Sequence, residues 1–113
     1  MGSFDDRRRG SEEKFRYEQD LHFKITAKRN RLFGNWVADR LGLSAGETEE
    51  YARSVIEADL QQPGDDDILA KVEEDLRAKS VAITRAQLRA KLDEFAKEAQ
   101  AQMMRGQGHA KST

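Results

Sequence analysis

Three consecutive carboxylates, Asp65, Asp66 and Asp67, come nearest to a metal site among the residues of this chain. A calcium loop spreads its oxygen ligands over about a dozen residues and closes with a glutamate, which is not the spacing found here. Carboxylates also accept hydrogen bonds from the free amides at the start of a helix and favour the positive end of its dipole. We therefore predict that the cluster starts a helix and that the chain holds no metal.

Side chains suited to catalysis are scarce. The chain has no cysteine and two histidines, His22 and His109, and its glycines match neither a dinucleotide-binding nor a phosphate-binding loop. The acidic run from Glu73 to Asp75 is typical of a solvated helix face, with Asp75 placed to meet a basic partner. The sequence predicts a protein that is not an enzyme and that has no resident cofactor.

The elements that position these residues are predicted to be helices. Charged residues make up 36% of the 113 positions, hydrophobic residues make up 37%, and the only proline is Pro63. Strong helix formers dominate, which favours an all-α fold with one modest core. No apolar run approaches the roughly 20 residues that span a bilayer, and the N-terminus is charged where a signal peptide is apolar. We therefore expect a cytoplasmic protein.

Apolar residues at spacings of three and four predict four helices. The expected helices run from about residue 11 to 41, from Ser44 to the turn at Pro63, from just after Asp67, and from Thr84 to about residue 105. Capping boxes start the second helix, at Ser44 and Glu47, and the fourth helix, at Thr84 and Gln87. Gly42 suits a left-handed cap at the end of the first helix.

Short connections between these amphipathic helices predict a four-helix bundle over residues 16–105. The apolar stripes expected to form its core are Leu21, Ile25, Leu32, Phe33, Trp36, Val37 and Leu41, then Tyr51, Ala52, Val55, Ile56 and Leu60, then Ile68, Leu69, Val72 and Leu76, and finally Leu88, Leu92, Phe95, Ala96, Ala99 and Met103. A first helix of about 45 Å is longer than such a core, so its N-terminal part should overhang the body. Gly34 allows either the close approach of another backbone or a gentle bend. We predict a disordered tail over residues 106–113.

Charge is unevenly distributed along the chain. Residues 1–31 carry nine Lys or Arg against six Asp or Glu, whereas the remaining 82 residues carry eleven against fifteen. A basic N-terminal segment can meet nucleic acid, anionic lipid or an acidic protein groove. Its interleaved carboxylates would repel phosphates, which opposes nucleic acid. The densest basic patch, residues 28–31, spreads around the helix axis instead of lining one face.

Residues 1–15 have two interpretations. They form either a flexible arm that folds when a groove supplies apolar burial, or a frayed terminus. Phe4, Phe15 and Leu21 have little core to join, which the first interpretation explains. Sequence alone leaves both open.

Several motifs together resemble one family. They are the run from Phe4 to Arg8, the pair Lys14-Phe15, the run from Leu21 to Lys24, the run from Ala27 to Trp36 and the turn from Pro63 to Ile68. Over nearly all of the chain up to about residue 104, these motifs are similar to the zeta subunit of alphaproteobacterial F-type ATP synthases. The resemblance implies a four-helix bundle with a mobile N-terminal inhibitory segment. That segment enters the catalytic head between a catalytic and a non-catalytic subunit, near the rotor stalk, and blocks rotation in the direction of ATP hydrolysis.

The resemblance also implies which residues act. Those assigned to inhibition and partner binding are Phe4, Asp5, Asp6, Arg7, Arg8, Lys14, Phe15, Leu21, His22 and Lys24. The implied partners are the catalytic, non-catalytic and rotor subunits of the ATPase head, so the protein would meet the inner membrane only through the ATP synthase. Weak binding of adenine nucleotide by the bundle is also implied, and no residue here places its site.

One motif departs from the family. This chain has Gly10-Ser11 where relatives have alanine followed by an apolar residue, and a helix starting at Glu12 would leave residues 4–10 outside it. Both the shorter helix and the lost apolar side chain would weaken docking, so the departure predicts a weak inhibitor. Two other functions stay open, namely a helical adaptor that binds through the basic patch and a structural subunit with no switching role.

Overall fold

The computed structural model describes the backbone of residues 2–61 and 64–112 and the side chains of residues 14–61 and 64–105. Its elements are α1 (Gly2–Leu41), α2 (Ala45–Gln61), α3 (Asp65–Ala78) and α4 (Arg85–Ser112). Within these residues there is no strand, and Val81, Ala82 and Ile83 lie in the irregular connection between α3 and α4. The all-α prediction with four helices is confirmed.

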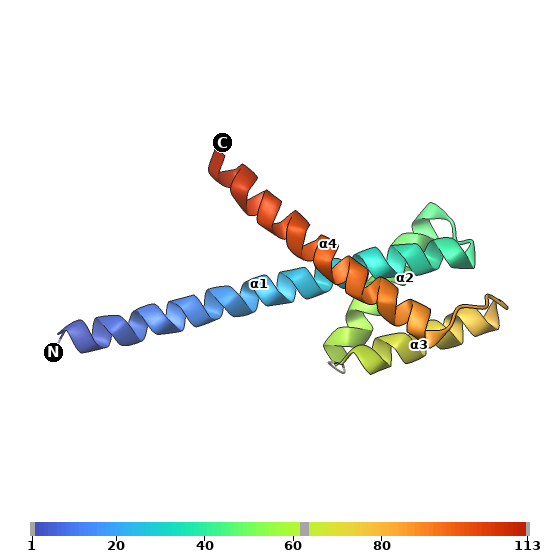
Figure 1. Cartoon of the computed structure of the whole chain (residues 1–113), viewed down its shortest axis with the longest axis horizontal. Helices are drawn as coiled ribbons and strands as arrows, with labels where there is room; N and C mark the ends of the chain where they lie inside the picture. Colours follow the sequence, from blue (N-terminus) through green and yellow to red (C-terminus); the bar gives the residue numbers. More distant parts are fainter. Residues whose placement is uncertain (1, 62–63, 113) are drawn as a thin grey trace.

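The chain is elongated because two of its helices project beyond the others (Figure 1). The molecule measures 65 × 33 × 24 Å and has a radius of gyration of 17.9 Å, whereas a compact domain of this length has about 13 Å. Helix α1 contacts α2, α3 and α4, so it is the central element of the bundle. Its N-terminal end and the C-terminal end of α4 extend away from the bundle in different directions. We call residues 2–20 of α1 the overhang.

The predicted caps set the ends of α1 and the starts of α2 and α4. Gly42 has a φ of 75°, the left-handed conformation expected after α1. The Glu47 amide donates to Ser44 Oγ over 3.3 Å, and the Ser44 amide donates to Glu47 Oε1 over 3.1 Å. Thr84 and Gln87 exchange the same pair of hydrogen bonds, at 2.9 and 3.2 Å. Both capping boxes are therefore confirmed.

Three predicted boundaries are wrong. Helix α1 begins at Gly2 and not near residue 11, so residues 4–10 belong to the helix. A single glycine costs a helix only about 1 kcal/mol, which is too little to end one that good helix formers continue on both sides. Helix α3 begins at Asp65 and not after Asp67. Helix α4 extends to Ser112 and does not end near residue 105.

The division into a flexible arm, residues 1–15, a bundle and a tail stays a prediction. The predicted turn at Pro63 lies outside the described residues.

A core of nine buried side chains holds the four helices together. They are Phe33, Val37, Val55, Ile68, Leu69, Val72, Leu76, Leu88 and Leu92. Full burial of one such side chain stabilises the fold by about 1.5–3 kcal/mol. Trp36, Leu41, Tyr51, Val81, Ile83 and Phe95 are partly buried against this core.

The predicted stripes were too long at two places. Leu21, Ile25 and Leu32 of α1 are only half-buried, and Leu60 of α2 is exposed. Leu60 lies in the last turn of α2, at the margin of the core, where the helical spacing continues but burial does not. The amphipathic pattern of a helix therefore marks a face correctly without marking where burial stops.

Gly34 lies where α1 and α2 approach each other closely. A Cβ atom built on Gly34 would lie 2.8 Å from the Ala52 Cα atom and 3.2 Å from the Ala52 Cβ atom. Carbon atoms in contact are normally about 3.5–4.0 Å apart, so only glycine allows this spacing. Of the two roles that the sequence left open, the structure supports the close approach of another backbone.

Candidate functional site

The overhang presents its side chains to solvent. Every described side chain of the overhang, residues 14–20, is exposed, and Phe15 keeps 60% of its surface accessible. Farther along α1, Phe23 is 55% accessible. Large apolar side chains are normally turned inward, so two exposed phenylalanines on one projecting helix mark a surface that fits a partner.

The predicted site residues with described side chains fall on two faces of α1. Phe15 and His22 line one shallow hollow together with Phe23. Lys14, Leu21 and Lys24 follow one another at spacings of seven and three, which places them on a different face. Lys14, His22 and Lys24 are exposed, whereas Leu21 is half-buried.

The remaining predicted residues are Phe4, Asp5, Asp6, Arg7 and Arg8. Their side chains lie outside the described residues, and so does His109.

The sequence missed Phe23 as a candidate contact residue. It lies eight residues after Phe15, two helical turns on, so the two rings share a face of α1. Ala27 lies four residues further along that face. It borders a small cavity between α1 and α2 that is also lined by Phe23, Ile56 and Leu60. The spacing carried this signal, but the stripe we expected to be buried ran through Leu21 and Ile25 instead.

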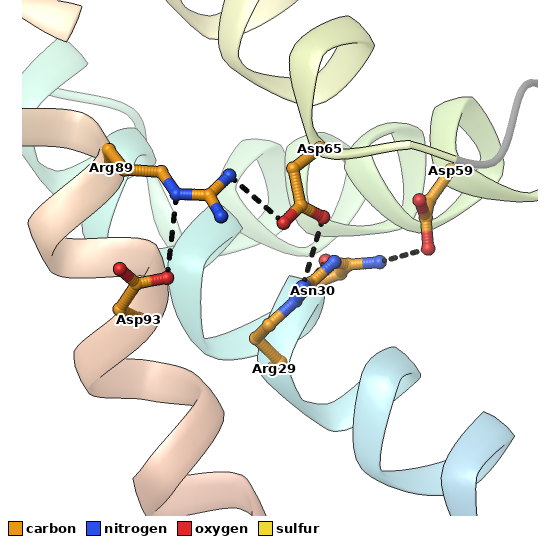
Figure 2. A network of polar contacts seen from close by, with 6 residues as sticks. All are labelled: Arg29, Asn30, Asp59, Asp65, Arg89 and Asp93. Carbon is orange, nitrogen blue, oxygen red and sulfur yellow. Dashed lines mark hydrogen bonds and ion pairs between the residues drawn. The ribbon is translucent and has the colours of Figure 1, made fainter. Parts of the chain in front are cut away.

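Where α1 enters the bundle, an acidic side chain joins three helices (Figure 2). Asp65 Oδ1 lies 3.1 Å from Arg29 Nη1, and Asp65 Oδ2 lies 3.0 Å from Arg89 Nη1. Arg89 also meets Asp93 one turn further along α4, at 3.6 Å. Both oxygens of one carboxylate are thus held by guanidinium groups from α1 and α4. We call Arg29, Asp65 and Arg89 the Asp65 cluster.

A buried amide extends this network to α2. The Asn30 side chain is 1% exposed, and its Nδ2 donates to Asp59 Oδ2 over 3.0 Å. Arg29 Nε donates to Asn30 Oδ1 over 3.1 Å. Both ends of the buried amide are therefore satisfied, which burial requires. Among the described side chains, no fully buried nitrogen or oxygen atom lacks a partner.

This network uses part of the basic patch that the sequence singled out. Arg29 is only 14% exposed and points to Asp65, and Asn30 points to Asp59. Arg31 is exposed and Lys28 is half-buried. The patch therefore offers solvent fewer cationic groups than its sequence indicates, which weakens the case for an adaptor that binds through it.

The carboxylate cluster at the start of α3 has a role that differs from the predicted one. Gly64 occupies the N-cap position, and no side chain caps the first amides of α3. Asp65, Asp66 and Asp67 lie in the first turn, where they favour the helix dipole as expected. Asp65 is engaged by the two arginines. In the part of the chain whose side chains are described, no group of three potential ligands could hold a metal ion.

A second polar cluster fixes α2 against α3. The Tyr51 hydroxyl donates to Asp75 Oδ2 over 2.7 Å, and Lys71 Nζ lies 3.0 Å from the same oxygen. Burial, and next the hydrogen bond to Asp75, raises the pKa of Tyr51 well above its ordinary value. The expected basic partner of Asp75 is thus Lys71, and the cluster serves the fold.

The aromatic pair of α1 packs in the bundle as the spacing predicts. Phe33 is buried, and its ring centroid lies 6.3 Å from that of Trp36. Two cations cover the Trp36 ring, with Arg40 Cζ at 5.2 Å and Lys91 Nζ at 5.6 Å from its centroid. The ring is occupied by contacts within the chain.

Comparisons with known proteins agree with this arrangement. A family model described as ATPase inhibitor subunit zeta matches residues 1–102. A structure determined by solution NMR is 40% identical to this chain, and the match covers 76% of this chain and 98% of that one with a TM-score of 0.67. No curated protein matches this chain in the corresponding search. None of the described helical stretches combines the length and apolar character needed to cross a membrane.

Proposed function

Because this chain belongs to the family of the ATPase inhibitor subunit zeta, we propose that it inhibits ATP hydrolysis by an F-type ATP synthase by inserting the overhang into the catalytic head. The observation that carries the proposal is the exposure of the overhang, where residues 14–20 all face solvent and include Phe15. A helix that leaves its own bundle with apolar side chains uncovered is suited to a cleft in a partner.

The contacts that drive insertion are proposed to be apolar. Phe15 is uncovered in the free chain, and burial of a phenylalanine contributes about 1.5–3 kcal/mol. His22 and Phe23 line the same hollow and extend this surface towards the bundle.

Charged residues of α1 are proposed to pair with the walls of the cleft. They are Asp5, Asp6, Arg7, Arg8, Lys14 and Lys24, with Phe4 and Leu21 as further apolar contacts. The partners are proposed to be the catalytic, non-catalytic and rotor subunits. The cleft opens and closes with the angle of the rotor, so a helix lodged in it stops rotation at one step.

The protein is proposed to act as a regulator with no reaction of its own and no resident cofactor. It would work in the cytoplasm, bound to the ATP synthase and peripheral to the inner membrane. The helical backbone at Gly10 removes one of the two reasons to expect weak inhibition. The other reason, the loss of an apolar side chain at Ser11, stands.

The test is a titration of ATP hydrolysis by the cognate F-type ATPase prepared without its own zeta subunit. The full chain should inhibit saturably, whereas a chain lacking residues 1–15 should bind the enzyme without inhibiting it. Binding of the full chain without inhibition would contradict the proposal.

A point substitution sharpens this experiment. Phe15→Ala should raise the concentration for half-inhibition by about 10- to 100-fold, which corresponds to about 1.5–3 kcal/mol of lost burial. Met104→Ala is the matched control, because Met104 is exposed to a similar extent on α4 and has no proposed role. Equal effects of the two substitutions would contradict an apolar contact by Phe15.

A further inference from the structure

The overhang is a long helix held at one end, so a small rotation of α1 near Arg29 moves Phe15 over a large distance. Phe15 lies fourteen residues before Arg29, which corresponds to about 21 Å of helix. A rotation of about 10° at Arg29 would therefore move the Phe15 ring by about 4 Å, roughly the distance between carbon atoms in contact. The overhang can present Phe15 to a partner at a defined position only if contacts with the bundle fix the direction of α1.

Apolar packing alone fixes this direction poorly. In the stretch where α1 leaves the bundle, Leu21 and Ile25 are only half-buried, and the fully buried Phe33 lies one turn beyond Arg29. Apolar contacts are non-directional, so half-buried side chains at the edge of a core permit a helix to tilt. Ion pairs and hydrogen bonds between fixed groups depend on geometry much more steeply.

The Asp65 cluster supplies such geometry at this position. One carboxylate accepts from Arg29 of α1 with one oxygen and from Arg89 of α4 with the other, at 3.1 and 3.0 Å (Figure 2). Asp65 is itself the first residue of α3. Three helices therefore meet at one side chain, and a tilt of α1 away from α3 lengthens the contact between Arg29 and Asp65.

A second restraint acts on the neighbouring residue. Asn30 is buried and bonded to Asp59 of α2, and Arg29 donates to the oxygen of Asn30. Rotation of α1 about its own axis would break the bond from Asn30 to Asp59, because it would carry Asn30 away from α2. The two restraints together oppose tilt and rotation at a single level of α1.

We propose that the Asp65 cluster is a joint that holds the overhang in a fixed direction relative to α3 and α4. The joint is electrostatic and partly exposed, with Asp65 30% accessible, so its stiffness depends on salt. Its consequence for inhibition rests on the proposed function, whereas the joint itself is a property of the isolated chain.

The test is a distance measurement by pulsed electron paramagnetic resonance on the full chain. Because the chain has no cysteine, labels can be placed cleanly at Glu18→Cys in the overhang and Glu74→Cys in α3. A second pair, Glu50→Cys and Glu74→Cys, reports on the bundle. All three positions are exposed.

In Asp65→Asn, the distribution of distances from Glu18 to Glu74 should become at least twice as wide, while the Glu50–Glu74 distribution stays the same. Asp66→Asn is the matched control, because Asp66 is exposed in the same turn and removes the same charge from the start of α3. It should leave both distributions unchanged. At about 1 M salt the Debye length falls to about 3 Å, so the wild-type Glu18–Glu74 distribution should widen as well.

If Asp65→Asn folds and its Glu18–Glu74 distribution is unchanged, the proposal that the Asp65 cluster holds the overhang is overturned. Widening of both distributions would also overturn it, because the whole bundle would then have loosened. If Asp65→Asn does not fold, Arg29→Met decides the matter through the same two distances, since it removes the contact that joins α1 to Asp65. None of these readings uses the ATPase, so the joint and the proposed inhibition can fail separately.

Discussion

Gly34 offers a sharp test of how α1 and α2 are packed. In Gly34→Ala, the new Cβ would lie 2.8 Å from the Ala52 Cα and 3.5 Å from Val55 Cγ2. The obstacle is backbone, which cannot move aside as the end of a flexible side chain can. The two helices would therefore have to separate by about 1 Å to restore normal contact.

The expected magnitude is the difference of two effects. Overpacking of a core contact costs about 1–3 kcal/mol, whereas alanine is better than glycine within a helix by about 1 kcal/mol. The net expectation is a loss of up to about 2 kcal/mol in the free energy of unfolding. For a domain of this size, this corresponds to a melting temperature lower by up to about 15 °C.

The assay is thermal and urea unfolding followed by far-ultraviolet circular dichroism. Gly46→Ala is the matched control, because the same atom is added within α2 where nothing lies within 4 Å. It should stabilise the chain by up to about 1 kcal/mol. If Gly34→Ala raised the melting temperature as Gly46→Ala does, the close approach of the two helices would be refuted.

Two further predictions concern the polar contacts. Ser44→Ala should destabilise α2 by about 1 kcal/mol in urea unfolding, since it removes the cap on the Glu47 amide. The hydrogen bonds from Ser44 lower the pKa of Glu47 below its ordinary value. The ionised Glu47 side chain therefore stabilises the fold above the pKa that it has in the unfolded chain, and this stability is lost as the pH falls through its pKa in the folded chain. The melting temperatures of wild type and Glu47→Gln should therefore converge in acid. Tyr51→Phe should cost about 0.5–1.5 kcal/mol, since it removes the hydroxyl bonded to Asp75. Because the folded pKa of Tyr51 is raised, that stability is present below the unfolded pKa and lost at higher pH. We therefore expect wild type to lose stability in alkali, where Tyr51 ionises in the unfolded chain, more steeply than Tyr51→Phe does. An equal loss of stability in the two proteins would contradict this.

The sequence was informative wherever a local rule governs the structure. Ser44 with Glu47, and Thr84 with Gln87, made both capping boxes because a box depends only on residues three apart. The family resemblance rested on motifs spread along the chain, and the match to the zeta family confirms it. The all-α fold followed from composition and spacing.

The sequence was less informative wherever two distant segments must meet. Arg29 and Asp65 are 36 positions apart, and no spacing rule announces that one will hold the other. We therefore assigned Arg29 to a solvated basic patch and Asp65 to a helix cap, and both assignments were incomplete. The start of α1 was also misjudged, because a local cost at Gly10 was weighed without the helix that continues on either side.

That continuity bears on how the overhang is maintained. An isolated helix must first form a nucleus, which fixes several residues for a single hydrogen bond and is unfavourable. Here the bundle holds residues 29–38 of α1 through Asp65, Asp59 and the apolar core, so the nucleus already exists. Extension of the helix from there toward Lys14 adds one backbone hydrogen bond for each residue that is fixed. The net free energy of each such step is close to zero. Because the side chains of residues 14–20 are exposed, a partner that covers Phe15 needs only to tip this balance. The bundle thus presents the overhang near the conformation in which it would bind, and the contact surface can be small.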